Sequence, residues 1–212
     1  MARISMKRAA AFALLPVLIG AGAYAASRQA TPAPRAAIAA TEWQPQAGDV
    51  ILTAADDLLG SQIASASGDN AIYSHIGLVV EHDGRLAVVE ASPMGEGHVA
   101  YADLAAFTTD PETSTLLILR PAAAIDTARL NRDAARLAAA QIPFDFALDM
   151  ADDERLYCAE LVYKMLGAAG LDTRSIPWSE AYVPMSGERR LVTPDAFSHS
   201  PALRQVYRRA GS

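Results

Sequence analysis

Cysteine is nearly absent: the 212-residue chain contains one, Cys158. A single cysteine excludes a disulfide within the chain. The sequence also lacks a zinc-binding cluster, a phosphate-binding loop, a dinucleotide-binding glycine fingerprint, internal repeats and coiled-coil heptads. We therefore expect no metal site and no cofactor.

Positive charge is also scarce, with 18 Lys and Arg against 24 Asp and Glu and a formal net charge of −6. Nucleic acids and anionic membrane surfaces are bound mainly through Lys and Arg, so the composition disfavours both as partners. With 51% hydrophobic residues in 22.4 kDa, the chain is long enough for one domain with a substantial core.

The first residues have the composition of an export signal. The segment begins with the basic residues Arg3, Lys7 and Arg8 and continues with the uncharged stretch 9–26. Small residues, Ala23 and Ala25, stand before the cleavage point. We predict a signal peptide over 1–25 and a periplasmic or secreted protein. Cleavage would remove three positive and no negative charges, which takes the net charge from −6 to −9.

A permanent membrane span over the same residues is the weaker alternative. Pro16, Gly20 and Gly22 interrupt the apolar run, and alanine dominates it. Membrane contact is therefore expected only if the N-terminal segment stays uncleaved. No cysteine stands near the cleavage point, which excludes lipid attachment to an N-terminal cysteine.

After the signal, residues 26–45 contain many alanines and three prolines without apolar periodicity, which predicts a flexible tether. The domain is expected over 46–212. In chain order, we expect strand 50–53, helix 56–66, strands 74–81, 85–91 and 98–101, helix 102–107, strand 114–120, helices 126–141 and 158–169, and a helix starting at Thr193-Pro194-Asp195. Residues 171–193 show little periodicity and are expected to cover the surface.

An Asp83-Gly84 pair between two β-branched runs predicts a hairpin. If these are the two loop residues, His82 faces Arg85, and His75, Gly77 and Glu90 share one face of the sheet. His75 and Glu90 then become diagonal neighbours, and Gly77 leaves room for the carboxylate to reach the imidazole. A slip of one residue would separate the two side chains.

The segment around Cys158 predicts an amphipathic helix, because apolar residues recur there at three- and four-residue intervals and Gly170 offers a stop. The thiol falls in the first turn, where free N–H groups and the helix dipole stabilise a thiolate. The alternative is an inert cysteine packed as a small hydrophobic residue. Thiol, imidazole and carboxylate together are the parts of a cysteine hydrolase.

Five motifs together resemble the YiiX/YebB-like family of circularly permuted papain-fold cysteine hydrolases in the NlpC superfamily. They are Gly48-Asp49-Val50-Ile51-Leu52, Ser74-His75-Ile76-Gly77-Leu78-Val79, Val88-Val89-Glu90-Ala91, Pro143-Phe144-Asp145 and Leu156-Tyr157-Cys158-Ala159-Glu160-Leu161-Val162. The resemblance covers about residues 46–205. It implies an α+β fold with a small antiparallel sheet or barrel packed against helices. It also implies Cys158 as nucleophile, His75 as general base, Glu90 as third polar residue and Tyr157 as a substrate-binding contributor.

The remaining polar candidates fit structural roles better. His82 lies in the predicted turn, and His98 and His199 have no companion at ligand spacing. Glu160 points about 200° around the helix from the thiol, which favours a structural ion pair. Asp145 is expected to cap or brace the helix that follows it.

Three functions remain open. The first is an exported cysteine amidase or peptidase that acts on a peptide or amide of the cell envelope. The second is a lipid or thioester acyl hydrolase or transferase, because lecithin:retinol acyltransferase shares the permuted fold. The third is a catalytically silent binding module of the cell envelope. The sequence sets no oligomeric state.

Overall fold

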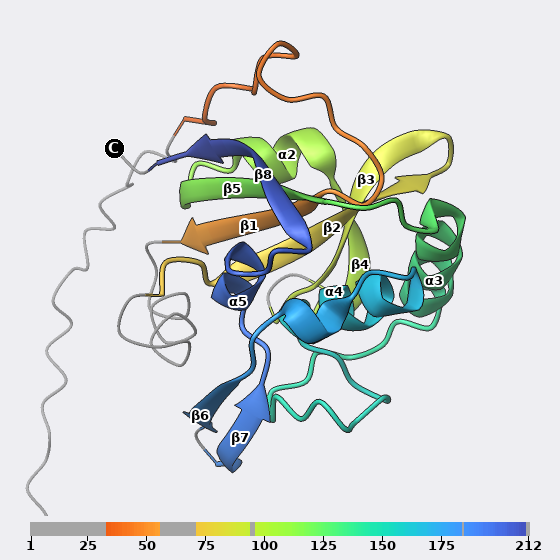
Figure 1. Cartoon of the computed structure of the whole chain (residues 1–212), viewed down its shortest axis with the longest axis vertical. Coiled ribbons are helices and arrows are strands. Elements are labelled where there is room, and N and C mark those ends of the chain that lie inside the picture. The colour runs from red at the N-terminus through yellow and green to blue at the C-terminus, as the bar shows by residue number, and fades with distance from the viewer. Residues whose placement is uncertain (1–32, 56–70, 94–95, 184, 211–212) are drawn as a thin grey trace, which may run out of the picture. The chain divides into compact units, whose positions relative to one another are not determined.

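The computed structural model describes residues 33–55, 71–93, 96–183 and 185–210. Six antiparallel strands form one sheet in the order β4-β3-β2-β1-β5-β8. Their bounds are β1 Val50–Ala55, β2 His75–His82, β3 Arg85–Ala91, β4 Val99–Asp103, β5 Thr113–Pro121 and β8 Leu203–Arg209. A separate two-stranded sheet joins β6 (Ser179–Val183) to β7 (Gly187–Leu191), and Figure 1 shows it below the larger sheet.

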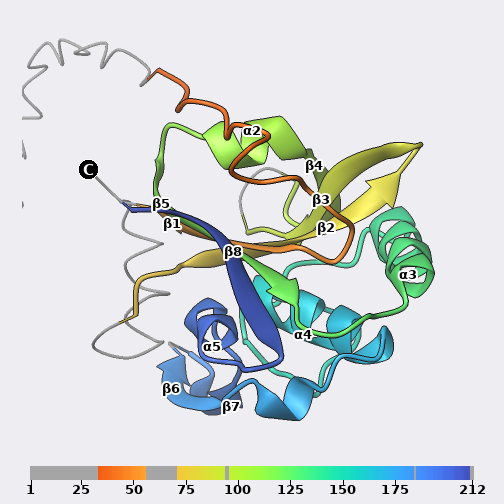
Figure 2. The same ribbon diagram turned by 45° about the horizontal axis from the view of Figure 1, so that its top comes forward.

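Helices cover both faces of the six-stranded sheet. The α3 helix (Thr127–Ala139), α4 (Cys158–Ala168) and α5 (Pro194–Ser198) lie on one side, and α2 (Leu104–Thr109) lies on the other, as Figure 2 shows. Alternating strand residues feed the two cores: Ile76, Leu78 and Val80 pack towards α4, whereas Val79 and Val88 pack towards α2. The predicted α+β fold, an antiparallel sheet packed against helices, is confirmed.

The predicted elements among the described residues appear within a residue or two of their expected bounds, whereas the strands β6, β7 and β8 were not predicted. The short helix α2 begins at Leu104 and not at 102, because the side chain of Asp103 accepts a hydrogen bond from the Ala106 N–H and so caps the helix start. Residues 171–193, which were expected to cover the surface, contain β6 and β7. The expected helix 56–66 lies outside the described residues.

Part of the expected tether packs on the domain. The Trp43 side chain is buried among Ile51 and Val79, and its indole Nε1 donates to Asp49 Oδ2 at 2.9 Å. Arg120 donates to both oxygens of the same carboxylate, from Nε at 2.6 Å and from Nη2 at 2.8 Å. The fully buried Asp49 therefore connects the segment before β1 with β5.

Within the described residues, no helix is long and apolar enough to cross a membrane.

Candidate active site

His75 and Glu90 meet across the hairpin of β2 and β3. The turn residues Asp83 and Gly84 both have positive φ, 50° and 72°, as a two-residue hairpin loop requires. The ladder pairs His82 with Arg85 as predicted. In that register, Nε2 of His75 lies 2.5 Å from Oε2 of Glu90. The predicted diagonal pair is therefore formed, with 23% and 19% of the two side chains exposed.

Gly77 lies between these two residues on β2. A Cβ atom at this position would stand 2.3 Å from Val88 Cγ1 and 3.1 Å from Phe107 Cζ. The space left by the missing side chain of Gly77 is therefore occupied by the side chains of Val88 and Phe107. The Phe107 ring also lies beside the imidazole, with 5.8 Å between the ring centroids of His75 and Phe107. No local pattern in the sequence predicts the position of Phe107, because this contact joins separate elements.

Cys158 is the first residue of α4, as the helical pattern predicted. Its N-cap residue, Tyr157, is extended with φ −92° and ψ 168°. Leu161, Val162 and Met165 of the helix are buried and anchor it on the sheet. The cysteine is 4% exposed and in no disulfide among the described residues.

The Cys158 thiol and the His75 imidazole are hydrogen-bonding partners. Burial lowers the pKa of His75, but the hydrogen bonds with Cys158 and Glu90 and the charges on these groups outweigh it and raise the pKa from 6.5 to about 10. Because Glu90 occupies Nε2, Nδ1 is the ring nitrogen left for the thiol. At neutral pH this arrangement holds an imidazolium between a sulfur atom and a carboxylate.

Tyr157, the residue before the cysteine, has only 3% of its surface exposed. Its hydroxyl donates to the Val192 carbonyl at 3.1 Å and accepts from the Val192 N–H at 3.2 Å. Burial raises the pKa of Tyr157, so the hydroxyl stays neutral and can serve both roles. The side chain thus fixes the start of α4, and its contact with substrate stays a prediction.

Glu160 is fully buried on the side of α4 away from the thiol. Its Oε1 lies 2.6 Å from Lys164 Nζ, and its Oε2 accepts from the Tyr157 N–H at 3.4 Å. Desolvation raises the pKa of Glu160 to about 7, against the opposing effect of Lys164. The ion pair expected for this residue is present.

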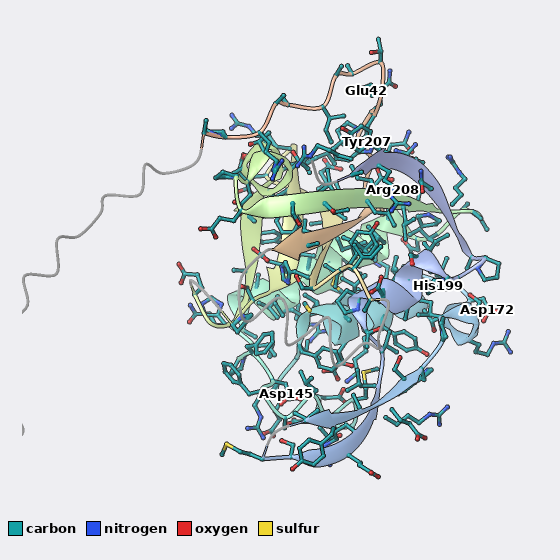
Figure 3. All side chains as sticks on the ribbon, turned by 90° about the vertical axis from the view of Figure 1, so that its left-hand side faces the viewer. Glu42, Asp145, Asp172, His199, Tyr207 and Arg208 are labelled. Atoms are coloured by element: carbon teal, nitrogen blue, oxygen red, sulfur yellow. The ribbon has the colours of Figure 1, made fainter. Side chains whose placement is uncertain are left out.

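Asp145 braces the chain that leads to the cysteine. Its carboxylate accepts from the Ala147 N–H at 2.8 Å and from the Asp149 N–H at 2.6 Å. The bracing expected from the sequence is therefore observed, on a turn and not on a helix. Figure 3 shows Asp145 and His199 on separate parts of the molecule.

Two of the other three histidines contact residues other than Cys158 and His75. His82 stacks on Tyr101 with 3.8 Å between ring centroids, and Nδ1 of His98 bonds the Val99 carbonyl at 2.9 Å. His199 is exposed after α5. No group of three His, Cys, Asp or Glu side chains in the described part of the chain is placed to hold a metal ion.

A thiol at a helix start, packed on an antiparallel sheet that presents an imidazole and a carboxylate, is the arrangement of papain-like cysteine hydrolases. The family model described as permuted papain-like amidase enzyme, YaeF/YiiX, C92 family, matches residues 44–207. The chain belongs to this family, and the YiiX-like resemblance is confirmed.

Two relatives extend the comparison. The uncharacterized protein YiiX of Escherichia coli (strain K12) is 30% identical over 138 residues, which is 60% of this chain and 60% of that relative's length. The crystal structure of the metalloprotein YiiX from Escherichia coli O157:H7 matches with a TM-score of 0.66 and 25% identity, over 79% of this chain and 99% of the other.

Proposed function

We propose that this protein is an exported cysteine hydrolase, an amidase or peptidase that forms a thioacyl-enzyme on Cys158. The observation that carries the proposal is the contact of one imidazole, His75, with both the thiol and the Glu90 carboxylate. The family membership agrees with this class of chemistry.

In the first half of the reaction, the Cys158 thiolate attacks the amide carbonyl carbon and a sulfur–carbon bond forms. The His75 imidazolium then gives its proton to the amide nitrogen as the carbon–nitrogen bond breaks, and the amine leaves. In the second half, neutral His75 takes a proton from the water that attacks the thioester. The acid leaves, and the thiolate and imidazolium are restored. Glu90 holds the imidazole in the orientation that both proton transfers need.

The start of α4 supplies the groups that stabilise the oxygen anion formed during attack. The N–H groups of Cys158 and Ala159 lie in the first helical turn, where a helix has no internal acceptor for them. The positive end of the helix dipole lies at the same end of α4 as these N–H groups. An oxyanion next to the sulfur atom would therefore be stabilised by the same element that carries the nucleophile.

For the substrate, we propose an amide of a cell-wall peptide next to a free amine. The predicted export would bring the protein to such peptides. After loss of the predicted signal peptide, the net charge of −9 would attract cationic groups more than anionic phospholipid headgroups.

The test incubates the wild type and Cys158→Ala separately with peptidoglycan fragments and with phospholipids, and identifies the products by mass. We expect amide cleavage by the wild type, and a loss of several orders of magnitude in Cys158→Ala. His75→Ala should also slow alkylation of the thiol near neutral pH, because the cation beside it is gone. Undiminished turnover by Cys158→Ala would show that the nucleophile is misassigned.

The same experiment separates the alternatives. Fatty-acid release that depends on Cys158, without peptide cleavage, would favour a lipid or thioester acyl hydrolase. No product from either pool, together with an unreactive thiol, would favour a silent binding module.

A further inference from the structure

Two chain segments lead to the proposed reacting residues, and each is tied by hydrogen bonds to the same short stretch of the C-terminal region. Tyr157 precedes Cys158, and Ile72 and Tyr73 lie just before His75 in the sequence. Both contact residues 192–195, between β7 and the first turn of α5.

The first tie is the Tyr157 hydroxyl. It forms two hydrogen bonds with the backbone of Val192, one as donor and one as acceptor. Both groups are buried, and Val192 has no exposed surface. The N-cap of α4 is therefore held at a fixed distance from residue 192.

The second tie is the Asp195 carboxylate. Its Oδ2 accepts from the Ile72 N–H at 2.6 Å and from the Tyr73 N–H at 3.4 Å, across more than 120 residues of sequence. Desolvation raises the pKa of Asp195, and these two N–H groups oppose the rise. A buried carboxylate that accepts hydrogen bonds from a distant part of the backbone is well suited to hold in place the residues that lead into β2.

The residues between the two ties form a stiff connection. Thr193 and Pro194 are buried, and Pro194 stands at the start of α5 with its φ fixed by the ring. Ser198 Oγ donates to the Asp195 carbonyl at 2.7 Å and closes the short helix. Val192 and Asp195 therefore cannot move far relative to each other.

We propose that residues 192–195 act as a brace that sets the separation of Cys158 and His75, and that Asp195 is a positioning residue for the reaction. The inference rests on the proposed function only in taking this pair as the reacting one. Without the carboxylate, Ile72 and Tyr73 lose their acceptor and His75 can shift by a fraction of an ångström. A displacement of about 1 Å costs roughly a hundredfold in rate.

The test measures alkylation of Cys158 by iodoacetamide as a function of pH in folded protein, at a temperature well below unfolding. In Asp195→Ala we expect alkylation near neutral pH to slow by about tenfold or more, with the acid limb of the profile moved to higher pH. Asp195→Asn keeps an acceptor oxygen and should restore most of the rate. Ser175→Ala removes a hydrogen bond to Ser200 near α5 without touching the brace, and should match the wild type.

If Asp195 has a purely structural role, Asp195→Ala should lower the melting temperature but leave the pH profile of alkylation of the folded protein unchanged. That result would overturn the proposal that residues 192–195 act as a brace. If Asp195→Ala does not fold, Tyr157→Phe tests the other tie. It keeps the ring, removes both bonds to Val192 and should shift the profile in the same direction; an unchanged profile would again overturn the proposal. Because alkylation needs no substrate, failure to find a cleaved amide would count against the proposed function alone.

Discussion

Glu90 Oε2 lies 2.5 Å from Nε2 of His75, across a hairpin that brings together residues 15 positions apart. This contact fixes the direction of the ring, because the Nε2–H points at the carboxylate and Nδ1 is left for Cys158. It is also one reason why the pKa of His75 reaches about 10.

The first prediction concerns this carboxylate. In Glu90→Gln, the loss of the negative charge should lower the pKa of His75 from about 10 towards 6.5 and reduce hydrolysis by about tenfold or more. The alkaline limb of the rate profile should move to lower pH, and an NMR titration of the imidazole should show the same change. Glu96→Gln neutralises an exposed carboxylate and serves as control. A pH–rate profile of Glu90→Gln that overlays the profile of the wild type would contradict the assigned contact between Glu90 and His75.

The sequence predicted those parts of the site that depend on local rules. The Asp83-Gly84 turn sets the register of the hairpin, and the register alone places His75 and Glu90 on one face. The apolar spacing after Cys158 likewise predicts the helix and the position of the thiol in its first turn. Both inferences use residues that are close together in the chain.

The missed features depend on contacts between distant residues. Asp195 reaches Ile72 over 123 residues, and nothing in the local sequence marks that contact. Among the described strands, β8 is the edge strand beside β5, so its polar residues Arg204 and Gln205 can stay exposed and no apolar run identifies it. Tertiary pairing, and not local pattern, decides such elements.

The second prediction uses the close packing at Gly77. In Gly77→Ala, the new methyl group would overlap Val88 and press on Phe107, so we expect a loss of about 1–3 kcal/mol in the free energy of unfolding. Because Phe107 lies against the imidazole, activity should fall as well. Urea unfolding and a rate assay measure the two effects.

Gly167→Ala is the matched control for this substitution. Gly167 lies in α4, where the new methyl group would meet only Thr173 at 3.4 Å, and alanine is the better helix former by about 0.5–1 kcal/mol. The control should be neutral or stabilising. Equal destabilisation by the two substitutions would speak against the overlap at Gly77.

The third prediction concerns the dependence of stability on pH. The pKa of Glu160 is raised from 4.5 to about 7, so the folded state binds this proton more tightly than the unfolded state. Its contribution to stability is therefore greatest below about pH 4.5 and is lost as the pH rises to about 7. The raised pKa of His75 contributes stability below 6.5 that is lost as the pH rises through about 10.

Glu160→Gln and His75→Gln separate these two windows. The first should flatten the profile of unfolding free energy between about pH 4.5 and 7, and the second between about 6.5 and 10. Chemical denaturation at a series of pH values measures both. A Glu160→Gln profile parallel to that of the wild type from pH 4.5 to 7 would contradict the assigned shift.

The fourth prediction concerns the N-terminus. If residues 1–25 are an export signal, the mature protein begins at Ala26 and stays in solution when released from the cell envelope. Mass spectrometry of the intact exported protein gives its first residue. A full-length protein that needs detergent would support an uncleaved anchor.

The last prediction asks how far the folded domain extends towards the N-terminus. The buried Trp43 indole packs beside Ile51 and donates to Asp49, so Trp43→Ala should lower the free energy of unfolding by about 3–5 kcal/mol. Glu42→Ala is the control, because Glu42 is exposed and its side chain accepts from the nearby Ala39 N–H; its effect should stay within about 0.5 kcal/mol. A freely moving tether up to residue 45 would make the two substitutions equally harmless. A large effect of Trp43→Ala alone would place the domain boundary before residue 43, in a segment whose composition gave no sign of packing.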